Sequence, residues 1–160
     1  MKKQKRIHLT LGFLTAPLCI FPAFAANECG APVRGVVTCS APDKAGVSYS
    51  SPTALDVRLG SFNITTTGLG VTGTAGASIT VGSNGAAVTN ITSTGIGVNL
   101  SSAGDSGNVS MTYNNGGTIK SAGSGAGISA TAANAGIVAI VIGAGSTVSA
   151  TGASGAGIRG

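Results

Sequence analysis

The residues best suited to chemistry in this 160-residue sequence are an aspartate and a serine set between two glycines, Gly104-Asp105-Ser106-Gly107. A serine hydroxyl becomes a strong nucleophile when a neighbouring base takes its proton, and in serine hydrolases that base is histidine. The only histidine of the sequence is His8, near the N-terminus. Glycine, aspartate and serine are also the residues that favour tight turns. We therefore interpret the tetrapeptide as a turn between strands and expect no catalytic residue in this chain.

Carboxylates and glycine strings offer no better site. Glycan cleavage by paired carboxylates, or by carboxylates with a cation, needs acidic side chains at matched positions, but Asp56 and Asp105 lie far apart and at different points of the repeat. The sequence also contains the string Gly68-Leu69-Gly70-Val71-Thr72-Gly73, which matches a nucleotide-binding pattern. We do not expect it to bind a phosphate, because no helix follows it to present an N-terminus. The sequence predicts no metal ligand and no cofactor.

Residues 1–25 have the three parts of a secretory signal peptide. Basic residues come first, an apolar run extends from Leu9 to Phe24, and small residues flank a cleavage point between Ala25 and Ala26. The alternative is a transmembrane helix, but the run contains a glycine and two prolines and falls short of the roughly 20 residues that cross a bilayer. We expect residues 1–25 to direct export through the inner membrane.

Removal of the signal changes the apparent chemistry of the chain. The whole sequence has nine Lys and Arg residues against four Asp and Glu residues, a net charge of +5. Four of the nine basic residues lie within residues 1–25, so the mature chain keeps five against four, or +1. Such a balance gives no support to a nucleic-acid or anionic-membrane partner.

Two cysteines remain in the mature chain, Cys29 and Cys39. An even pair in an exported chain most simply forms a disulfide. The alternative is a metal site, but no further ligand of the usual kind lies nearby in the sequence. We expect the disulfide, which would stabilise so short a loop by about 2–3 kcal/mol in the chain-entropy model.

The amino-acid composition of the mature chain changes near Ala54. Residues 26–54 hold prolines and the cysteine pair and are expected to be an irregular lead-in, whereas residues 55–160 contain no proline, few charges and frequent glycine. Glycine, serine, threonine and valine disfavour helix, and short alternating runs favour strands. Disorder is the alternative, but the high aliphatic content and low net charge oppose it. The clearest expected strands are Leu55 to Leu59, Phe62 to Ile64, Ile79 to Val81, Ile96 to Leu100 and Val109 to Tyr113.

The strands recur at a spacing that predicts a repeat architecture. Phe62, Ile79 and Ile96 each begin an alternating run, and they follow one another at equal steps of seventeen positions. Further on, the phrase from Gly117 to Ile128 returns as Ser146 to Ile158, and its closing Gly-Ala-Gly-Ile is repeated after thirty positions. Such short units bury their apolar faces only by stacking. The sequence therefore predicts a parallel β-helix of about five or six coils, with Phe62, Ile79 and Ile96 stacked on one another and coils about 4.8 Å apart.

The repeat phrases carry a family resemblance. The export signal, the cysteine pair and the successive phrases at Gly117 to Ile128, Ser146 to Ile158 and, more loosely, Ala77 to Val88 look like the N-terminal part of an autotransporter passenger, a type V secreted protein of Gram-negative bacteria. The resemblance covers about residues 55–160. It implies an all-β fold, a right-handed parallel β-helix, exposed at the cell surface or released outside it.

The resemblance also implies an outer-membrane translocator barrel in the full-length protein, and this sequence ends at Gly160 within a repeat phrase. We expect an incomplete passenger. Residues Ile140 to Gly152 also look like head repeats of trimeric autotransporter adhesins, which remains the alternative family.

Function is expected to be non-catalytic, as an adhesin-like or stalk-like passenger segment that contacts a host surface, a matrix component or a neighbouring bacterial cell. The alternative is the N-terminal part of an autotransporter hydrolase or protease whose catalytic domain lies elsewhere. The aliphatic run Ile137 to Ile142 in the last repeat predicts self-association of the 160-residue chain through an unpaired strand edge.

Overall fold

The computed structural model describes residues 29–39, 46–66, 69–76, 78–83 and 88–160. The expected signal peptide, with its cleavage point between Ala25 and Ala26, lies outside these ranges. Every regular element within them is a β-strand, and no helix with the length and apolar character to cross a membrane is found there.

Fourteen strands occur in the described parts of the chain, most of them five residues long. They are β1 (Val36–Cys39), β2 (Val47–Ser51), β3 (Leu55–Leu59), β4 (Phe62–Thr66), β5 (Val71–Ala75), β6 (Ile79–Ser83), β7 (Thr89–Ser93), β8 (Val98–Ser102), β9 (Val109–Tyr113), β10 (Thr118–Ser121), β11 (Ile128–Ala132), β12 (Val138–Ile142), β13 (Thr147–Ala150) and β14 (Ile158–Arg159). The alternating runs at Leu55–Leu59 and Val109–Tyr113 are confirmed to the residue.

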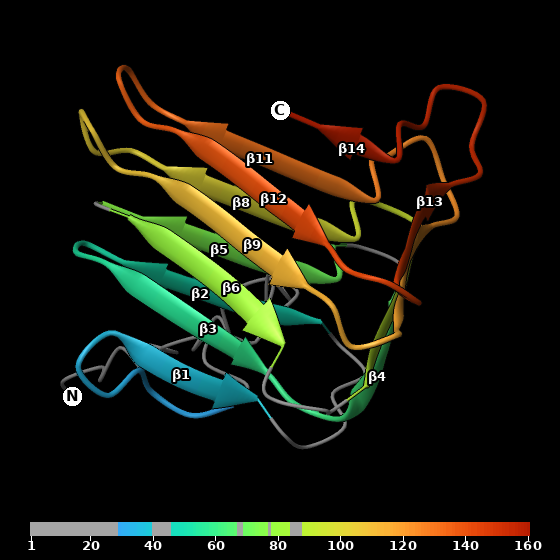
Figure 1. The fold of residues 1–160 in the computed structure, drawn as a ribbon, viewed down its shortest axis with the longest axis horizontal. Helices are drawn as coiled ribbons and strands as arrows, with labels where there is room; N and C mark the ends of the chain where they lie inside the picture. The colour runs from blue at the N-terminus through green and yellow to red at the C-terminus, as the bar shows by residue number, and fades with distance from the viewer. Residues whose placement is uncertain (1–28, 40–45, 67–68, 77, 84–87) are drawn as a thin grey trace, which may run out of the picture.

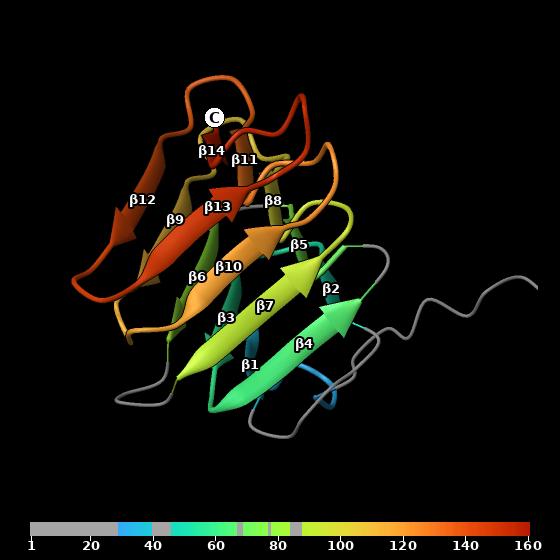
Figure 2. The same ribbon diagram turned by 90° about the vertical axis from the view of Figure 1, so that its right-hand side faces the viewer.

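The strands form three parallel sheets that stand as the walls of a prism (Figure 1). Wall A has the order β1-β3-β6-β9-β12, wall B has β14-β11-β8-β5-β2, and wall C has β13-β10-β7-β4. Figure 2 faces wall C, whose four strands run side by side with the first coil at the bottom and the last at the top. The predicted parallel β-helix is confirmed.

Each coil visits wall B, wall A and wall C in turn, so that three strands make one turn of the solenoid. In wall B, Val47 pairs with Val71, Val71 with Val98 and Val98 with Ile128, so these three coils are twenty-four, twenty-seven and thirty positions long. Ile128 pairs with Ile158 in the same wall. The echo between the two Gly-Ala-Gly-Ile phrases is therefore one full coil.

The step of seventeen positions is wrong as a coil length. Phe62 lies in β4 of wall C and Ile79 in β6 of wall A, whereas Ile96 precedes β8 and belongs to no strand. Phe62 pairs with Thr89, and Ile79 pairs with Leu55 and Val109. That step skips one strand and moves to another wall instead of completing a turn. Because the true coils are longer, the chain makes about four turns rather than five or six.

The lead-in expected to be irregular already belongs to the solenoid. β1 pairs with β3 in wall A, and β2 pairs with β5 in wall B. The segment holds two strands because Val36-Val37-Thr38-Cys39 and Val47-Ser48-Tyr49-Ser50 alternate like the later repeats, and the prolines stand outside both runs. The boundary expected after residue 54 is therefore a change of composition and not a change of fold.

The core is a set of stacked columns of apolar side chains, with at least one column on the inner side of each wall. Inward residues stack on their counterparts one coil away, and burial of each such side chain stabilises the fold by about 1.5–3 kcal/mol. The columns are Val47, Val71, Val98 and Ile128 in wall B; Val37, Val57, Val81, Met111 and Ile140 in wall A; and Ile64, Ile91, Ile119 and Val148 in wall C. All are buried except Ile140 and Val148 in the last coil.

Glycines mark the corner between walls C and B, where successive coils approach most closely. A Cβ atom on Gly70 would collide with the carbonyl oxygen of Gly97, and one on Gly97 would collide with that of Gly127. Val71 and Val98 donate their N–H groups to the same two carbonyls, at 2.9 Å each. The corner therefore requires glycine immediately before β5 and β8.

Candidate functional site

The outer side of wall B is a regular array of uncharged polar side chains. Two columns run up the wall, because the alternate residues of each strand point outward and the strands are in register. Their members are Ser48, Thr72, Asn99 and Ser129 in one column and Ser50, Thr74, Ser101 and Thr131 in the other. Neighbours lie about 4.8 Å apart between coils and about 6.6 Å apart along a strand. Among the described strands of this wall, only Arg159 of β14, opposite Ser129, adds a charge.

Wall C carries a second polar array, and its side chains bind one another, as the hydroxyls of Ser101 and Thr74 do in wall B at 3.3 Å. Asn90 donates from Nδ2 to Oδ1 of Asn63 at 2.9 Å, and its own Oδ1 accepts the N–H of Thr118 at 2.9 Å. The second column runs through Thr65, Thr92, Lys120 and Ser149. Asn63 and Asn90 both lie on the outer side of their strands.

Wall A differs from the other two because its outer side changes character along the solenoid. Asp56 and Arg58 of β3 form an ion pair, with Nε of the arginine 2.9 Å from the carboxylate. The same two columns hold Thr80 and Gly82 one coil up, then Ser110 and Thr112, and finally Ala139 and Val141 in β12. A surface ion pair of this kind stabilises a protein by less than about 1 kcal/mol.

The Gly104-Asp105-Ser106-Gly107 tetrapeptide lies in the turn between β8 and β9, as expected. Gly107 donates its N–H to the carbonyl of Gly104 at 3.1 Å, which closes the turn. The carboxylate of Asp105 accepts from Nδ2 of Asn134 in the turn one coil above, at 2.8 Å. Asp105 therefore ties two stacked turns together, an arrangement that has no resemblance to a serine nucleophile with its base.

The interior contains a few polar groups with structural partners. Tyr113 at the end of β9 is fully buried and donates its hydroxyl to the carbonyl of Thr89 in β7. Thr89 in turn donates Oγ1 to the carbonyl of Gly60. Burial raises the pKa of Tyr113 to about 12, because the phenolate would lose its hydration. A tyrosine that holds its proton this firmly is suited to bridging two walls and not to acid–base catalysis at neutral pH.

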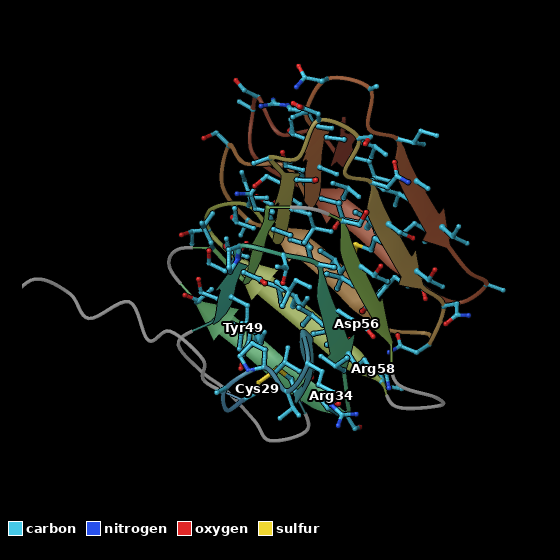
Figure 3. All side chains as sticks on the ribbon, turned by 90° about the vertical axis from the view of Figure 1, so that its left-hand side faces the viewer. Cys29, Arg34, Tyr49, Asp56 and Arg58 are labelled. Atoms are coloured by element: carbon cyan, nitrogen blue, oxygen red, sulfur yellow. A yellow bond between two sulfur atoms is a disulfide. The ribbon has the colours of Figure 1, made fainter. Side chains whose placement is uncertain are left out.

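The end of the solenoid at β1 and β2 is closed by a compact cluster (Figure 3). Cys29 and Cys39 form a disulfide with their Cα atoms 5.0 Å apart. The Tyr49 hydroxyl accepts the N–H of Cys29 at 2.7 Å and donates to the carbonyl of Gly30 at 3.1 Å. Cys39 and Tyr49 are buried, and Cys29 packs against the core. We call residues 29–35 the N-terminal cap.

Among the residues that the structure describes, no group of three or more acidic, histidine or cysteine side chains could hold a metal ion. Sequence reasoning identified the cysteines but missed Tyr49 and Tyr113. Both tyrosines occupy inward positions of alternating strands, and that alternation was the available signal.

Comparison of the chain with protein-family models, with curated proteins and with solved structures finds no significant match in any of the three. The fold and the surfaces described above are thus the grounds on which a function is proposed.

Proposed function

We propose that this chain is a non-catalytic segment of an autotransporter-type surface passenger, which acts as an adhesin or as the stalk that carries one. The observation that supports the proposal most directly is the surface of walls B and C. Their outward positions are almost all serine, threonine and asparagine, in register from coil to coil, around an aliphatic core.

Such a wall offers many weak hydrogen-bonding groups at a constant spacing. Each group binds water nearly as well as it binds a partner, so a single contact contributes little. Contacts made together along a rigid wall add through their high effective concentration. This is a means of adhering to a repetitive polar surface, such as a matrix polymer or the coat of a neighbouring cell.

The alternative function as part of a hydrolase gains no support from the described residues. Asp105 is engaged with Asn134, and the buried Tyr113 has a raised pKa and a structural partner. Fold alone does not decide function. The proposal therefore rests on the surfaces and on the expectation of export.

Surface display is tested first. Gram-negative cells that express the gene containing this sequence are treated with an external protease, and an antibody against residues 98–121 follows the chain. We expect the chain to be digested on intact cells while a periplasmic marker protein survives. Protection of the chain on intact cells would reject the passenger proposal.

Adhesion is tested with matched charge substitutions. Thr74→Asp with Ser101→Asp alters adjacent outward positions of wall B, and Thr80→Asp with Ser110→Asp alters the equivalent positions of wall A. We expect the first pair to reduce attachment of displaying cells to matrix-coated plates or to one another, and the second pair to leave it unchanged. Equal attachment of all variants and of cells without the chain would remove the adhesin role and leave the stalk.

A further inference from the structure

We propose that the Cys29–Cys39 disulfide is a redox latch, which holds the N-terminal cap over the first coil and releases it on reduction without unfolding the coils above. The proposal concerns a conformational device in this chain and is independent of the proposed surface function.

The cap has few attachments besides the disulfide. Val33 is 72% exposed, and Arg34 and Gly30 are exposed as well. The cap folds back through a hairpin in which Val33 and Val36 exchange both backbone hydrogen bonds, at 2.8 and 3.0 Å. A segment with so little buried apolar surface belongs to the least stable part of a fold.

Within the described residues, the cap is joined to the first coil by the disulfide to Cys39, by the pair of hydrogen bonds to the hydroxyl of Tyr49, and by a hydrogen bond from the N–H of Asp56 to the carbonyl of Gly35 at 2.8 Å. Cys29 also packs against the core. The bonds to Tyr49 depend on the disulfide, because Cys29 supplies one of them and Gly30 is its neighbour. Loss of the disulfide therefore loosens the bonds to Tyr49 as well.

The first coil is attached to the next one by pairings that do not involve the cap. β3 is paired along its whole length with β6, and β4 with β7. Leu59 and Ile64 in the same coil are buried. In a stack of repeats each coil depends mainly on its neighbours, so opening at one end need not spread through the solenoid.

Closing the latch is a two-electron oxidation. A thiolate of one cysteine attacks an external disulfide and forms a mixed disulfide, and the second thiolate then displaces the reduced partner. The two cysteines lose two protons and two electrons, and the external disulfide becomes two thiols. Dithiothreitol reverses the step, since its two thiols become a cyclic disulfide and both cysteines are protonated again.

Hydrogen exchange of the full chain with and without dithiothreitol tests the latch. We expect the amides of Val33 and Val36, which the hydrogen bonds of the cap hairpin protect, to exchange on the order of a hundredfold faster after reduction, which is the loop-closure effect of a disulfide of this size. The amides of β8 and β11 should keep their rates. In the double variant Cys29→Ser with Cys39→Ser, the amides of Val33 and Val36 should exchange fast whether or not reductant is present.

Trypsin gives a second readout with an internal control. Arg34 lies in the cap and Arg159 at the far end in β14, and both are exposed. We expect reduction to accelerate cleavage after Arg34 and to leave cleavage after Arg159 unchanged. Tyr49→Phe should produce part of this acceleration while the disulfide is intact.

Two results would overturn the proposal. Equal exchange of the Val33 and Val36 amides in the oxidised and reduced chain would mean that the cap stays closed without its disulfide. Loss of the β-sheet circular dichroism signal on reduction would mean that the disulfide maintains the whole fold and is no latch.

Discussion

The two ends of the described solenoid are built in different ways. At the β1 end the inward side chains Val37, Val47 and Tyr49 are buried, and a disulfide, a tyrosine hydroxyl and a short antiparallel hairpin lie beside them. At the β12 end the inward Ile140 and Val148 are half-buried, and Val141 and Ile158 are 55% and 48% exposed. Figure 1 places these two ends at the bottom and the top of the stack.

Adding another repeat to a stack of repeats does not cover its exposed end, as the difference between the two ends shows. Every coil covers the one before it and offers the same apolar surface to the next. The β1 end is different, because covalent and polar contacts replace aliphatic stacking there. The first three predictions below test this difference between the β1 end and the β12 end, and the fourth concerns the interior of the stack.

The largest effect is expected from removing the same side chain at each end. Ile64→Ala in β4 empties a site that is 1% exposed, and we expect it to lower the free energy of unfolding by about 2–5 kcal/mol. Ile140→Ala in β12 removes a half-buried side chain and should cost about 1 kcal/mol. Urea denaturation of both variants measures the two costs, and equal values would contradict the comparison.

The polar part of the closed end is probed by Tyr49→Phe. The N–H of Cys29 and the carbonyl of Gly30 lose their common partner, which we expect to cost about 1–3 kcal/mol. Tyr113→Phe is the matched control in the body of the stack, where one donated hydrogen bond to Thr89 is lost. We expect Tyr49→Phe to lower the midpoint of thermal unfolding of the oxidised protein more than Tyr113→Phe does. The reverse order would mean that the interior hydrogen bond contributes more to stability than the bonds at the β1 end.

The β12 end is probed through association. Val141→Lys sets a charge on the outer side of an edge strand, which natural sheets use to prevent edge pairing. We expect the unaltered chain to self-associate in sedimentation at high concentration and the variant to do so about tenfold more weakly. Thr74→Lys, on wall B away from that edge, is the control. A monomer at all concentrations would show that the exposed strand is harmless.

The smallest effect is expected from alkaline pH, which acts inside the stack and at neither end. The folded pKa of Tyr113, about 12, lies above the ordinary 10.0, so the unfolded chain loses this proton first as the pH rises. The contribution of protonated Tyr113 to the free energy of unfolding is complete below pH 10 and disappears between about pH 10 and 12. Near pH 11 the free energy of unfolding should be lower by about 1 kcal/mol. Tyr113→Phe should lack this part of the pH dependence when urea titrations at neutral pH and near pH 11 are compared.

The strands and the stacked architecture were predictable because, in an alternating run, apolar residues point toward the core and polar residues point toward the solvent. Leu55-Asp56-Val57-Arg58-Leu59 places three side chains inward and two outward, and the structure follows it. The coil length was not predictable from the same signal. All three walls use similar strands, so matching one strand to the next similar one does not reveal which wall it occupies.

A better marker of the coil was present in the glycines. The phrase Gly-x-Gly followed by valine or isoleucine closes at Val71, Val98, Ile128 and Ile158, and these four residues stack in wall B. Glycine is required there by the close approach of backbones at the corner. A steric requirement of this kind repeats once per turn, whereas a strand pattern repeats three times.

Some features of the candidate surfaces were also predictable from the sequence, and others were not. The cysteine pair is evident from composition, but the hydroxyl of Tyr49 between Cys29 and Gly30 depends on chain segments brought together from 20 residues apart. The polar columns of walls B and C appear only once the register is known. Local pattern therefore indicates which residues face outward, and long-range pairing determines which of them are neighbours.

The unequal lengths of the coils, shown by the Val47–Val71 and Val98–Ile128 pairings, have one more consequence. Strands keep their length while the bends between them absorb every added residue, so the bends are permissive positions for foreign peptides. A short epitope inserted into the turn around Asp105 or Asn134 would project from the side of the stack at a known height, and choosing the other turn would move it by one coil. New recognition elements can thus be added to this molecule at chosen levels without any change to its core.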